Sequence, residues 1–414
     1  MFDLEGLGQK AKTASRFLST ISSIKKNEGL MLAAESIEKN ITSILSANEI
    51  DLKNARENGT PDAMLDRLML NEKRIITMAE SFRNLISLED PIGEIIRGFK
   101  RPNGLEISQI RIPLGVIGII YESRPNVTAD AAGLCLKAGN VVILRGGKEA
   151  INSNIAIVVA INKGLTQAGF PEGSVQLVTD TSHEVATKMM KLNKYIDVLI
   201  PRGGAGLINT VVQNATVPVI ETGVGNCHIF VDSSADIKMG TDIIVNAKVS
   251  RPSVCNAAET LLVHRDIAKD FIPFALAELK KKNVQLRGCA ETIELFPDAK
   301  LATEEDYATE FLDYILAVKV VGSVDEAIDH ITKFGTKHSE CIVTKDYKNS
   351  QKFLMEVDAA AVYVNASTRF TDGGEFGFAA ELGISTQKLH ARGPMGLKEL
   401  TTTKYLIRGE GQVR

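Results

Sequence analysis

The hydrophobic positions of the chain change their spacing near residue 100. From residue 3 to about 95, apolar residues recur at helical intervals, as in Leu30, Ile37, Ile41 and Ile44. A Pro-Asn-Gly turn at 102–104 then lies between two short alternating stretches. The pattern predicts a helical segment followed by a β-hairpin over about 100–114.

Short, continuous apolar runs alternate with helical patterns through the rest of the chain. The first set includes VIGIIY, NVVILR, SVQLVTD, IDVLIP and VPVIE, and a second set after Glu221 includes CHIFVD, AETLLVH, YILAVKVV, SECIVTKD and AAVYVNAS. Apolar strands separated by helices are typical of a parallel sheet that is buried on both faces. We therefore expect an α/β fold with two such units, and a last strand near 402–408.

Composition excludes several classes of protein. The 414 residues carry a net charge of −3, which offers no general attraction for nucleic acid or an anionic membrane surface. The first residues lack the apolar core of a signal peptide, and no apolar run reaches the roughly 18 residues of a membrane span. These features predict a cytoplasmic protein with a small-molecule partner, and neither nucleic acid nor membrane.

Five cysteines are scattered without a C-x-x-C pair, which argues against a disulfide framework and against a zinc site. We expect reduced thiols and no metal. Cys135, Cys227 and Cys341 lie in apolar runs and are interpreted as structural. Cys255, in SRPSVCNAAETLLVH, follows a turn that contains Arg251, and a nearby cation favours the nucleophilic thiolate. The alternative is one more buried thiol.

Glycines and cations follow two of the predicted strands. In DVLIPRGGAGLINTVV, the glycine turn (Gly203, Gly204 and Gly206) precedes a helix whose N–H groups suit a pyrophosphate, and Arg202 adds positive charge. The alternative is a tight strand-to-helix turn. NVVILR ends in Arg145, and Lys148 follows after two glycines; two cations there suit the 2′-phosphate of NADP or line a solvated loop. Glu221 ends VPVIE, a position that also suits a surface or cap residue.

Together these stretches resemble the aldehyde dehydrogenase superfamily and, within it, the γ-glutamyl phosphate reductase family. The resemblance runs from about 100 to the end of the chain. It rests on PLGVIGIIYESRPNVTADAAGLCLKAGNVVILRGGKEA, IPRGGAGLI, VIETGVGNCHIFVD, SRPSVCNAAETLLVH and YVNASTRFTDGGEFGFAAELGISTQKLHARGPMGLKELTTTKY. It implies a Rossmann-like NADP-binding domain (1–99 and 115–222), an α/β catalytic domain (223–392) and a small β oligomerisation flap (100–114 and 393–414).

The resemblance also implies roles for single residues. Cys255 is the expected nucleophile, with Glu221 lying 255 − 221 = 34 positions earlier, as the superfamily spacing requires. Asn126, in YESRPNVT, is the amide nearest the expected oxyanion hole, and Glu310 matches the residue that contacts the nicotinamide ribose. Cofactor contacts are expected from Arg145, Lys148, Arg202, Gly203, Gly204, Gly206 and Glu310, and substrate contacts from Asn365 and Arg369.

The activity implied is reduction of γ-glutamyl phosphate by NADPH to glutamate 5-semialdehyde, with release of phosphate, through a cysteine thioester in proline biosynthesis. The resemblance also implies that the chain forms a homo-oligomer, either a dimer or a tetramer, and that it associates with the upstream glutamate kinase. Two alternatives remain at this point. One is a hydrolytic NAD(P)-dependent aldehyde dehydrogenase, in which Glu221 activates water. The other is a non-enzymatic scaffold with the same fold.

Overall fold

The computed structural model describes residues 2–122, 124–378 and 380–414, and it divides into two compact units. The first unit comprises Met1–Thr222, Gly377–Gly383 and Met395–Arg414. The second comprises Gly223–Phe376 and Ile384–Pro394. The expected domains differ from these units at the C-terminal end: 377–383 lie with the first unit rather than with 223–392, and 393–394 lie with the second unit rather than with the oligomerisation flap. The other segments expected in the flap, 100–114 and 395–414, belong to the first unit. The assignment of domains to cofactor, catalysis and assembly stays a prediction.

Five helices open the first unit, as the helical spacing predicted. They are α1 (Leu4–Leu18), α2 (Ser23–Lys39), α3 (Ile41–Glu57), α4 (Asp62–Leu68) and α5 (Glu72–Ile86). Their apolar residues form buried stripes, and α5, for example, buries Ile75, Met78, Phe82 and Leu85. These spacings of three and four place the side chains on one helix face, which explains why periodicity alone identified the segment.

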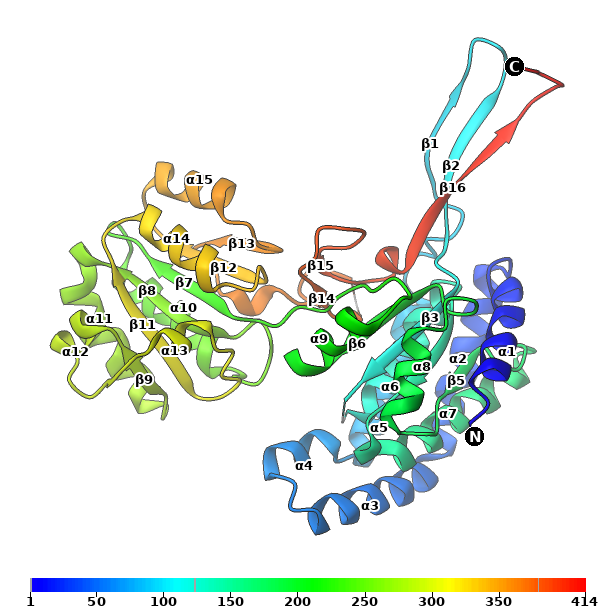
Figure 1. The fold of residues 1–414 in the computed structure, drawn as a ribbon, viewed down its shortest axis with the longest axis horizontal. Coiled ribbons are helices and arrows are strands. Elements are labelled where there is room, and N and C mark those ends of the chain that lie inside the picture. Colours follow the sequence, from blue (N-terminus) through cyan, green and yellow to red (C-terminus); the bar gives the residue numbers. More distant parts are fainter. Residues whose placement is uncertain (1, 123, 379) are drawn as a thin grey trace. The chain divides into compact units, whose positions relative to one another are not determined.

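A four-stranded parallel sheet, in the order β5-β4-β3-β6, forms the centre of the first unit (Figure 1). Its strands are β3 (Val116–Tyr121), β4 (Val141–Arg145), β5 (Val175–Leu177) and β6 (Val198–Arg202). The helices between and after them are α6 (Pro125–Lys137), η1 (Lys148–Ala150), α7 (Ile151–Gln167), α8 (His183–Met190) and α9 (Ala205–Asn214). All six residues of β3 are buried, as expected of a strand covered on both faces.

One predicted strand of this sheet is reduced to a single bridge. VPVIE pairs with β6 only through Val219 and Leu199. The N–H of Leu199 donates to the carbonyl of Pro218, and the N–H of Ile220 donates to the carbonyl of Leu199. Because Pro218 has no N–H, it cannot donate a further hydrogen bond to β6. The apolar run therefore extends the sheet edge without forming a strand.

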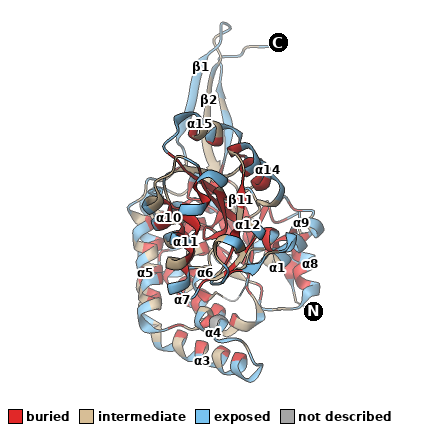
Figure 2. Ribbon diagram, turned by 90° about the vertical axis from the view of Figure 1, so that its left-hand side faces the viewer, coloured by how far each residue is buried: buried red, intermediate tan, exposed pale blue. Residues whose placement is uncertain are grey.

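The predicted hairpin is confirmed, and it joins the last strand of the chain. β1 (Ile95–Lys100), β2 (Glu106–Pro113) and β16 (Thr401–Arg408) form an antiparallel sheet in the order β1-β2-β16, here called the flap. The expected range of about 100–114 omitted most of β1, which pairs with residues 106–110. Every residue of β1 is exposed (Figure 2).

The second unit contains a seven-stranded parallel sheet in the order β10-β9-β11-β8-β7-β12-β13. Its strands are β7 (Cys227–Val231), β8 (Ala258–His264), β9 (Gln285–Gly288), β10 (Lys300–Leu301), β11 (Ile315–Val321), β12 (Ser339–Val343) and β13 (Ala361–Val364). Its helices are α10 (Ile237–Val249), α11 (Arg265–Lys281), α12 (Ala290–Leu295), α13 (Glu304–Ala308), α14 (Val324–Phe334) and α15 (Tyr347–Glu356). Shorter elements in the C-terminal part are η2 (Thr368–Phe370), β14 (Ile384–Ser385), β15 (Gly393–Pro394) and η3 (Lys398–Leu400).

Two apolar clusters cover the faces of this larger sheet. Ile229 packs into the cluster of α10 and α11, whereas its neighbour Phe230 packs into the cluster of α14 and α15. Successive residues of a strand point to opposite faces, so an uninterrupted apolar strand supplies both clusters. The short elements β9, α12, β10 and α13 were not predicted.

Candidate active site

Cys255 lies in the turn between α10 and β8, here called the Cys255 turn (residues 250–257), and its side chain is half-buried. The backbone of Gly225 touches this turn, because a Cβ at Gly225 would lie 1.5 Å from the carbonyl oxygen of Cys255. The N–H of Gly225 donates to Oε1 of Glu310 at 2.7 Å. Burial raises the pKa of Glu310, and this hydrogen bond opposes the rise. The sequence-predicted residues Cys255 and Glu310 thus both contact Gly225.

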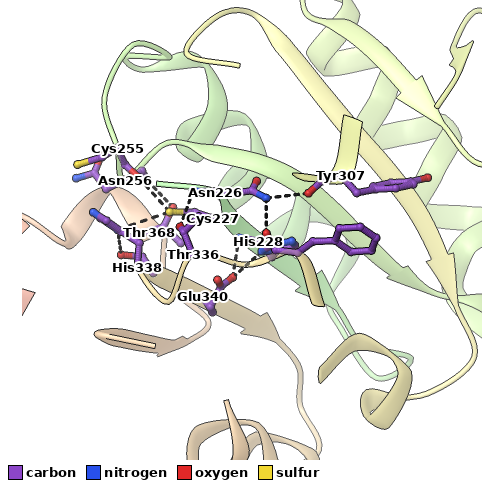
Figure 3. A network of polar contacts seen from close by, with 12 residues as sticks. Asn226, Cys227, His228, Cys255, Asn256, Tyr307, Thr336, His338, Glu340 and Thr368 are labelled. Carbon is purple, nitrogen blue, oxygen red and sulfur yellow. Dashed lines mark hydrogen bonds and ion pairs between the residues drawn. The ribbon is translucent and has the colours of Figure 1, made fainter. Parts of the chain in front are cut away.

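A buried polar network supports the Cys255 turn from the sheet (Figure 3). The thiol of Cys227 donates to the carbonyl oxygen of Cys255 at 3.2 Å, and its sulfur lies 3.7 Å from Nδ1 of His338. That nitrogen lies 2.8 Å from Oγ of Ser339, which in turn lies 2.7 Å from Oγ1 of Thr371. Burial raises the pKa of Cys227 well above its usual value, so this cysteine stays a neutral thiol.

Asn256 connects the Cys255 turn to the segment that carries Arg369. Its side-chain N–H donates to the carbonyl of Thr371 at 2.9 Å, and its own carbonyl accepts from Oγ1 of Thr368 at 2.7 Å. The guanidinium of Arg369 donates to Oδ1 of Asn256 and, through Nε, to Oγ of Ser250 at 3.0 Å. The structure therefore brings Arg369, predicted for the substrate pocket, to the residue that follows Cys255.

Asn365, the other residue predicted for the substrate pocket, is engaged with backbone. It adopts a φ of 56°, its Oδ1 accepts from the N–H of Thr344 at 2.8 Å, and its Nδ2 donates to the carbonyl of Thr344 at 2.9 Å. Both polar groups of the amide thus hold the segments after β12 and β13 together. A contact of Asn365 with substrate stays a prediction.

A buried ion pair spans the Cys255 turn. Nζ of Lys248, in α10, lies 2.5 Å from Oε2 of Glu259, in β8, and both side chains are fully buried. The other oxygen of Glu259 accepts from the N–H of Leu312 at 3.1 Å, close to Glu310 in the chain. Burial raises the pKa of Glu259 to about 7, against the pull of Lys248, and burial lowers the pKa of Lys248. The sequence analysis missed this pair, because its two residues lie within apolar patterns.

The residues predicted to bind the cofactor lie in the first unit, apart from Glu310. Arg145 and Arg202 end β4 and β6, on either side of the end of β3. Nη2 of Arg145 donates to the carbonyl of Thr181 at 2.6 Å, while its Nε is buried with no partner among the described residues. Burial lowers the pKa of Arg145. Lys148 is exposed, so an anion has access to its ammonium group.

The glycine turn precedes α9, as predicted, and it is exposed. The N–H of Gly204 donates to Oε2 of Glu122 at 2.9 Å, and a Cβ at Gly203 would meet that carboxylate at 2.6 Å. The N–H groups of the first turn of α9 have no partner within the helix, and Gly206 leaves open space beside them. With Arg145, Lys148 and Arg202 on this edge, the donor set fits an anionic dinucleotide. Glu122, which orders the turn, was not identified from sequence.

Glu221 and Asn126 also belong to the first unit, whereas Cys255 belongs to the second. Glu221 is half-buried in the segment after the bridge at Val219. Asn126 is exposed in the first turn of α6, where its Nδ2 donates to Oδ2 of Asp130 at 3.0 Å. Burial raises the pKa of Asp130, and the hydrogen bonds from Asn126 and Ser81 oppose the rise. The catalytic roles of Glu221 and Asn126 stay predictions.

The described residues, 2–122, 124–378 and 380–414, carry neither a cross-link nor a metal site. No disulfide joins the cysteines of this part of the chain. It contains no cluster of histidine, cysteine or carboxylate side chains that could hold a metal ion. None of its helices is both long and apolar enough to cross a bilayer.

Comparison with known proteins agrees with this arrangement. The aldehyde dehydrogenase family model matches residues 3–293. Gamma-glutamyl phosphate reductase of Clostridium perfringens is 66% identical over 407 residues, which cover 98% of each chain. The crystal structure of gamma-glutamyl phosphate reductase from Thermotoga maritima is 52% identical, covers 100% of both chains and has a TM-score of 0.97. The chain therefore belongs to the aldehyde dehydrogenase family.

Proposed function

We propose that this chain reduces γ-glutamyl phosphate to glutamate 5-semialdehyde, with release of phosphate, in proline biosynthesis, and that Cys255 carries the acyl group. The observation that carries the proposal is identity of 66% over 98% of the chain with a relative named gamma-glutamyl phosphate reductase. The placement of Cys255 in a rigidly held, half-buried turn supports it.

The chemistry of Cys255 follows from the bond that is broken. Its thiolate attacks the carbonyl carbon, a sulfur–carbon bond forms, and the bond from that carbon to the phosphate oxygen breaks. The electron pair of this bond leaves with phosphate, and a thioester remains on Cys255. Arg251 in the same turn and Arg369 beside Asn256 supply positive charge that favours the thiolate.

Release of the product restores the nucleophile. A bound nicotinamide cofactor supplies the hydride that reduces the thioester carbon. The oxygen on that carbon then carries negative charge, and we infer that the backbone N–H of Cys255 and the amide of Asn126 stabilise it. The carbon–sulfur bond breaks, the aldehyde leaves, and Cys255 is again a thiolate. The buried contacts of Gly225 and Cys227 hold the Cys255 peptide in place during both steps.

The cofactor of a reductase of this family is a nicotinamide dinucleotide, and we infer that it is NADP. Arg145, Lys148, Arg202 and the glycine turn would hold its phosphates on the first unit, and Glu310 its nicotinamide ribose. The exposure of Lys148 and the buried Nε of Arg145 support a role in binding the additional phosphate of NADP.

We also infer that the protein works as a cytoplasmic homo-oligomer, dimer or tetramer, that receives its labile substrate from an upstream glutamate kinase. Ile95, Phe99 and Ile407 of the flap are 66%, 45% and 60% exposed. A three-stranded sheet with apolar side chains and open edges is a site for pairing with a second copy. Replacing Ile95 and Ile407 by lysine should shift size-exclusion elution towards the monomer, whereas lysine at the exposed Val413 should not.

Phosphate dependence tests the proposed activity. The protein is mixed with glutamate 5-semialdehyde and NADP⁺, and NADPH absorbance is followed with and without phosphate. The reductase requires phosphate to release the acyl group, so no NADPH should form in its absence. Full activity without phosphate, yielding free glutamate and lost in Glu221→Gln, would establish the hydrolytic enzyme instead, because general-base catalysis is worth roughly 10²–10⁴-fold. No activity in either buffer would favour the scaffold.

A further inference from the structure

Arg369 is a half-buried cation whose side chain donates hydrogen bonds to neutral oxygens. Its guanidinium donates to Oγ of Ser250 at 3.0 Å and to Oδ1 of Asn256. These two residues lie at the ends of the stretch that contains Arg251 and Cys255, so Arg369 spans the Cys255 turn. Neutral acceptors orient a guanidinium but do not neutralise its charge.

A second cation lies in the same turn. Arg251 follows Ser250 directly, its side chain is exposed, and it makes no hydrogen bond or ion pair within the described residues. After burial, the charge of Arg251 is the next cause that lowers the pKa of Arg369, while Asp372 and the cysteines Cys255 and Cys227 oppose it. Two like charges held close together repel, and a bound dianion would relieve the repulsion.

From this geometry we propose that Arg369 and Arg251 form the subsite for the phosphoryl group of the acyl phosphate, and for inorganic phosphate in the reverse direction. The proposal rests on the function proposed above. The phosphate oxygen is bonded to the very carbon that Cys255 attacks, whereas the α-carboxylate lies at the other end of the carbon chain. Arg251 in the Cys255 turn and Arg369, which donates to both Ser250 and Asn256 of that turn, are therefore placed to meet the phosphoryl group. Bidentate donation from Arg369 also stabilises the leaving phosphate as its charge grows.

Kinetics of the reverse reaction separate the two anions of the substrate. We measure KM for phosphate and KM for semialdehyde in Arg369→Gln, Arg369→Lys and Arg251→Gln. Each glutamine variant should raise KM for phosphate by about tenfold or more, the loss expected for one charge-assisted hydrogen bond, with KM for semialdehyde nearly unchanged. Arg369→Lys keeps the charge but loses the planar, two-pronged arrangement of N–H donors. Its KM for phosphate should therefore lie between that of the unsubstituted protein and that of Arg369→Gln.

Arg265→Gln is the matched control. Arg265 is an exposed arginine of the same unit that pairs with Glu291 at 3.0 Å, so its substitution removes an equal charge away from the Cys255 turn. Both KM values should stay at their original levels. A raised KM for semialdehyde with an unchanged KM for phosphate in the Arg369 and Arg251 variants would overturn the proposal and assign the arginines to the α-carboxylate.

A binding measurement does not depend on turnover. Inorganic phosphate should slow alkylation of Cys255 by iodoacetamide, followed by mass spectrometry, in the unsubstituted protein and in Arg265→Gln. Phosphate should protect Cys255 much less in Arg251→Gln and in Arg369→Gln. The side chain of Arg251 is exposed, so its substitution should leave the fold intact and misfolding would not explain the loss of protection. Equal protection in all variants would sink the subsite. Protection that depends on the arginines in a protein without phosphate-dependent turnover would keep the subsite and reject the proposed function.

Discussion

The thiol of Cys227 donates a hydrogen bond to the backbone carbonyl of Cys255, with a sulfur-to-oxygen distance of 3.2 Å. The two residues are 28 positions apart, in β7 and in the turn before β8. Because Cys227 is completely buried, water does not compete for this contact. The peptide group of Cys255 is therefore positioned by a second, buried cysteine.

Replacing Cys227 tests this positioning role. Cys227→Ala removes one neutral hydrogen bond, worth about 1 kcal/mol, and should lower kcat roughly fivefold while KM values change little. Cys227→Ser keeps a donor and should retain most of the activity. Steady-state kinetics and the alkylation rate of Cys255 provide the two measurements. If serine and alanine were equally damaging, the volume of the sulfur, rather than its hydrogen bond, would be what matters.

Cys255→Ser should abolish turnover in a folded protein, because a serine hydroxyl is far less ionised than a thiol at neutral pH. NADPH formation measures turnover, and circular dichroism checks the fold. Cys289→Ser, at another half-buried cysteine of the second unit, is the control and should stay active. Activity above about a tenth of the original in Cys255→Ser, a loss of less than one tenfold step, would place the nucleophile elsewhere.

The two sheets could be predicted from sequence because their strands are buried on both faces. Apolar runs such as VIGIIY and CHIFVD correspond to β3 and β7, all of whose residues are buried. The exception, VPVIE, contains Pro218, whose missing N–H left a single bridge at Val219. The elements from β9 to α13 were missed because they are two to six residues long, too short for periodicity to be recognised.

The site was predictable only as far as local motifs reach. Cys255 and Arg369 belong to stretches with recognisable patterns, and the structure links them through Asn256. The partners that hold the Cys255 turn come from distant positions, for instance His338, which lies 111 residues from Cys227. A single sequence carries no signal for such a pairing.

Lys148→Gln tests the preference for NADPH. The exposed ammonium of Lys148 is suited to the 2′-phosphate, so its loss should lower the NADPH-to-NADH ratio of kcat/KM by about tenfold, as for one charge-assisted contact. Arg145→Ala should lower the ratio too, but it also removes the hydrogen bond to Thr181 and should reduce stability. Lys163→Gln, at an exposed site on α7, is the control. An unchanged ratio in both variants would remove this role from both residues.

Lys248 and Glu259 should stabilise the fold only when both are present. Lys248→Met leaves Glu259 buried without its cation and should cost about 3–5 kcal/mol in the free energy of unfolding. The double variant Lys248→Met, Glu259→Leu leaves no unpaired charge and should be clearly more stable than the single one. Urea unfolding measures both.

Lys238→Met removes one partner of an exposed ion pair on the same helix and should change stability by less than about 1 kcal/mol. Equal losses for the single and double Lys248 variants would show that packing volume, rather than an unpaired charge, sets the cost.

Two buried histidines should make the second unit sensitive to acid. Burial lowers the pKa of His330 to about 3 and that of His338 to about 4, from an ordinary value of 6.5. Below pH 6.5 the two histidines therefore bind protons in the unfolded chain but remain neutral in the folded chain until the pH approaches their lowered pKa values. The stability contributed by the two neutral side chains is complete above pH 6.5, and it is lost as the pH falls towards 4, by about 1.4 kcal/mol per pH unit for each histidine.

His338→Gln, which cannot be protonated, should reduce that slope by about 1.4 kcal/mol per pH unit, whatever it does to stability at neutral pH. The measurement is the free energy of unfolding in urea at several values between pH 6 and pH 4.5, with the slope of the variant subtracted from that of the original protein. His330→Gln should give a similar reduction. A slope that His338→Gln leaves unchanged would mean that His338 titrates alike in the folded and unfolded chain, and acid sensitivity would then have to come from carboxylates such as Asp358, whose pKa is held low by Arg392 and Lys388.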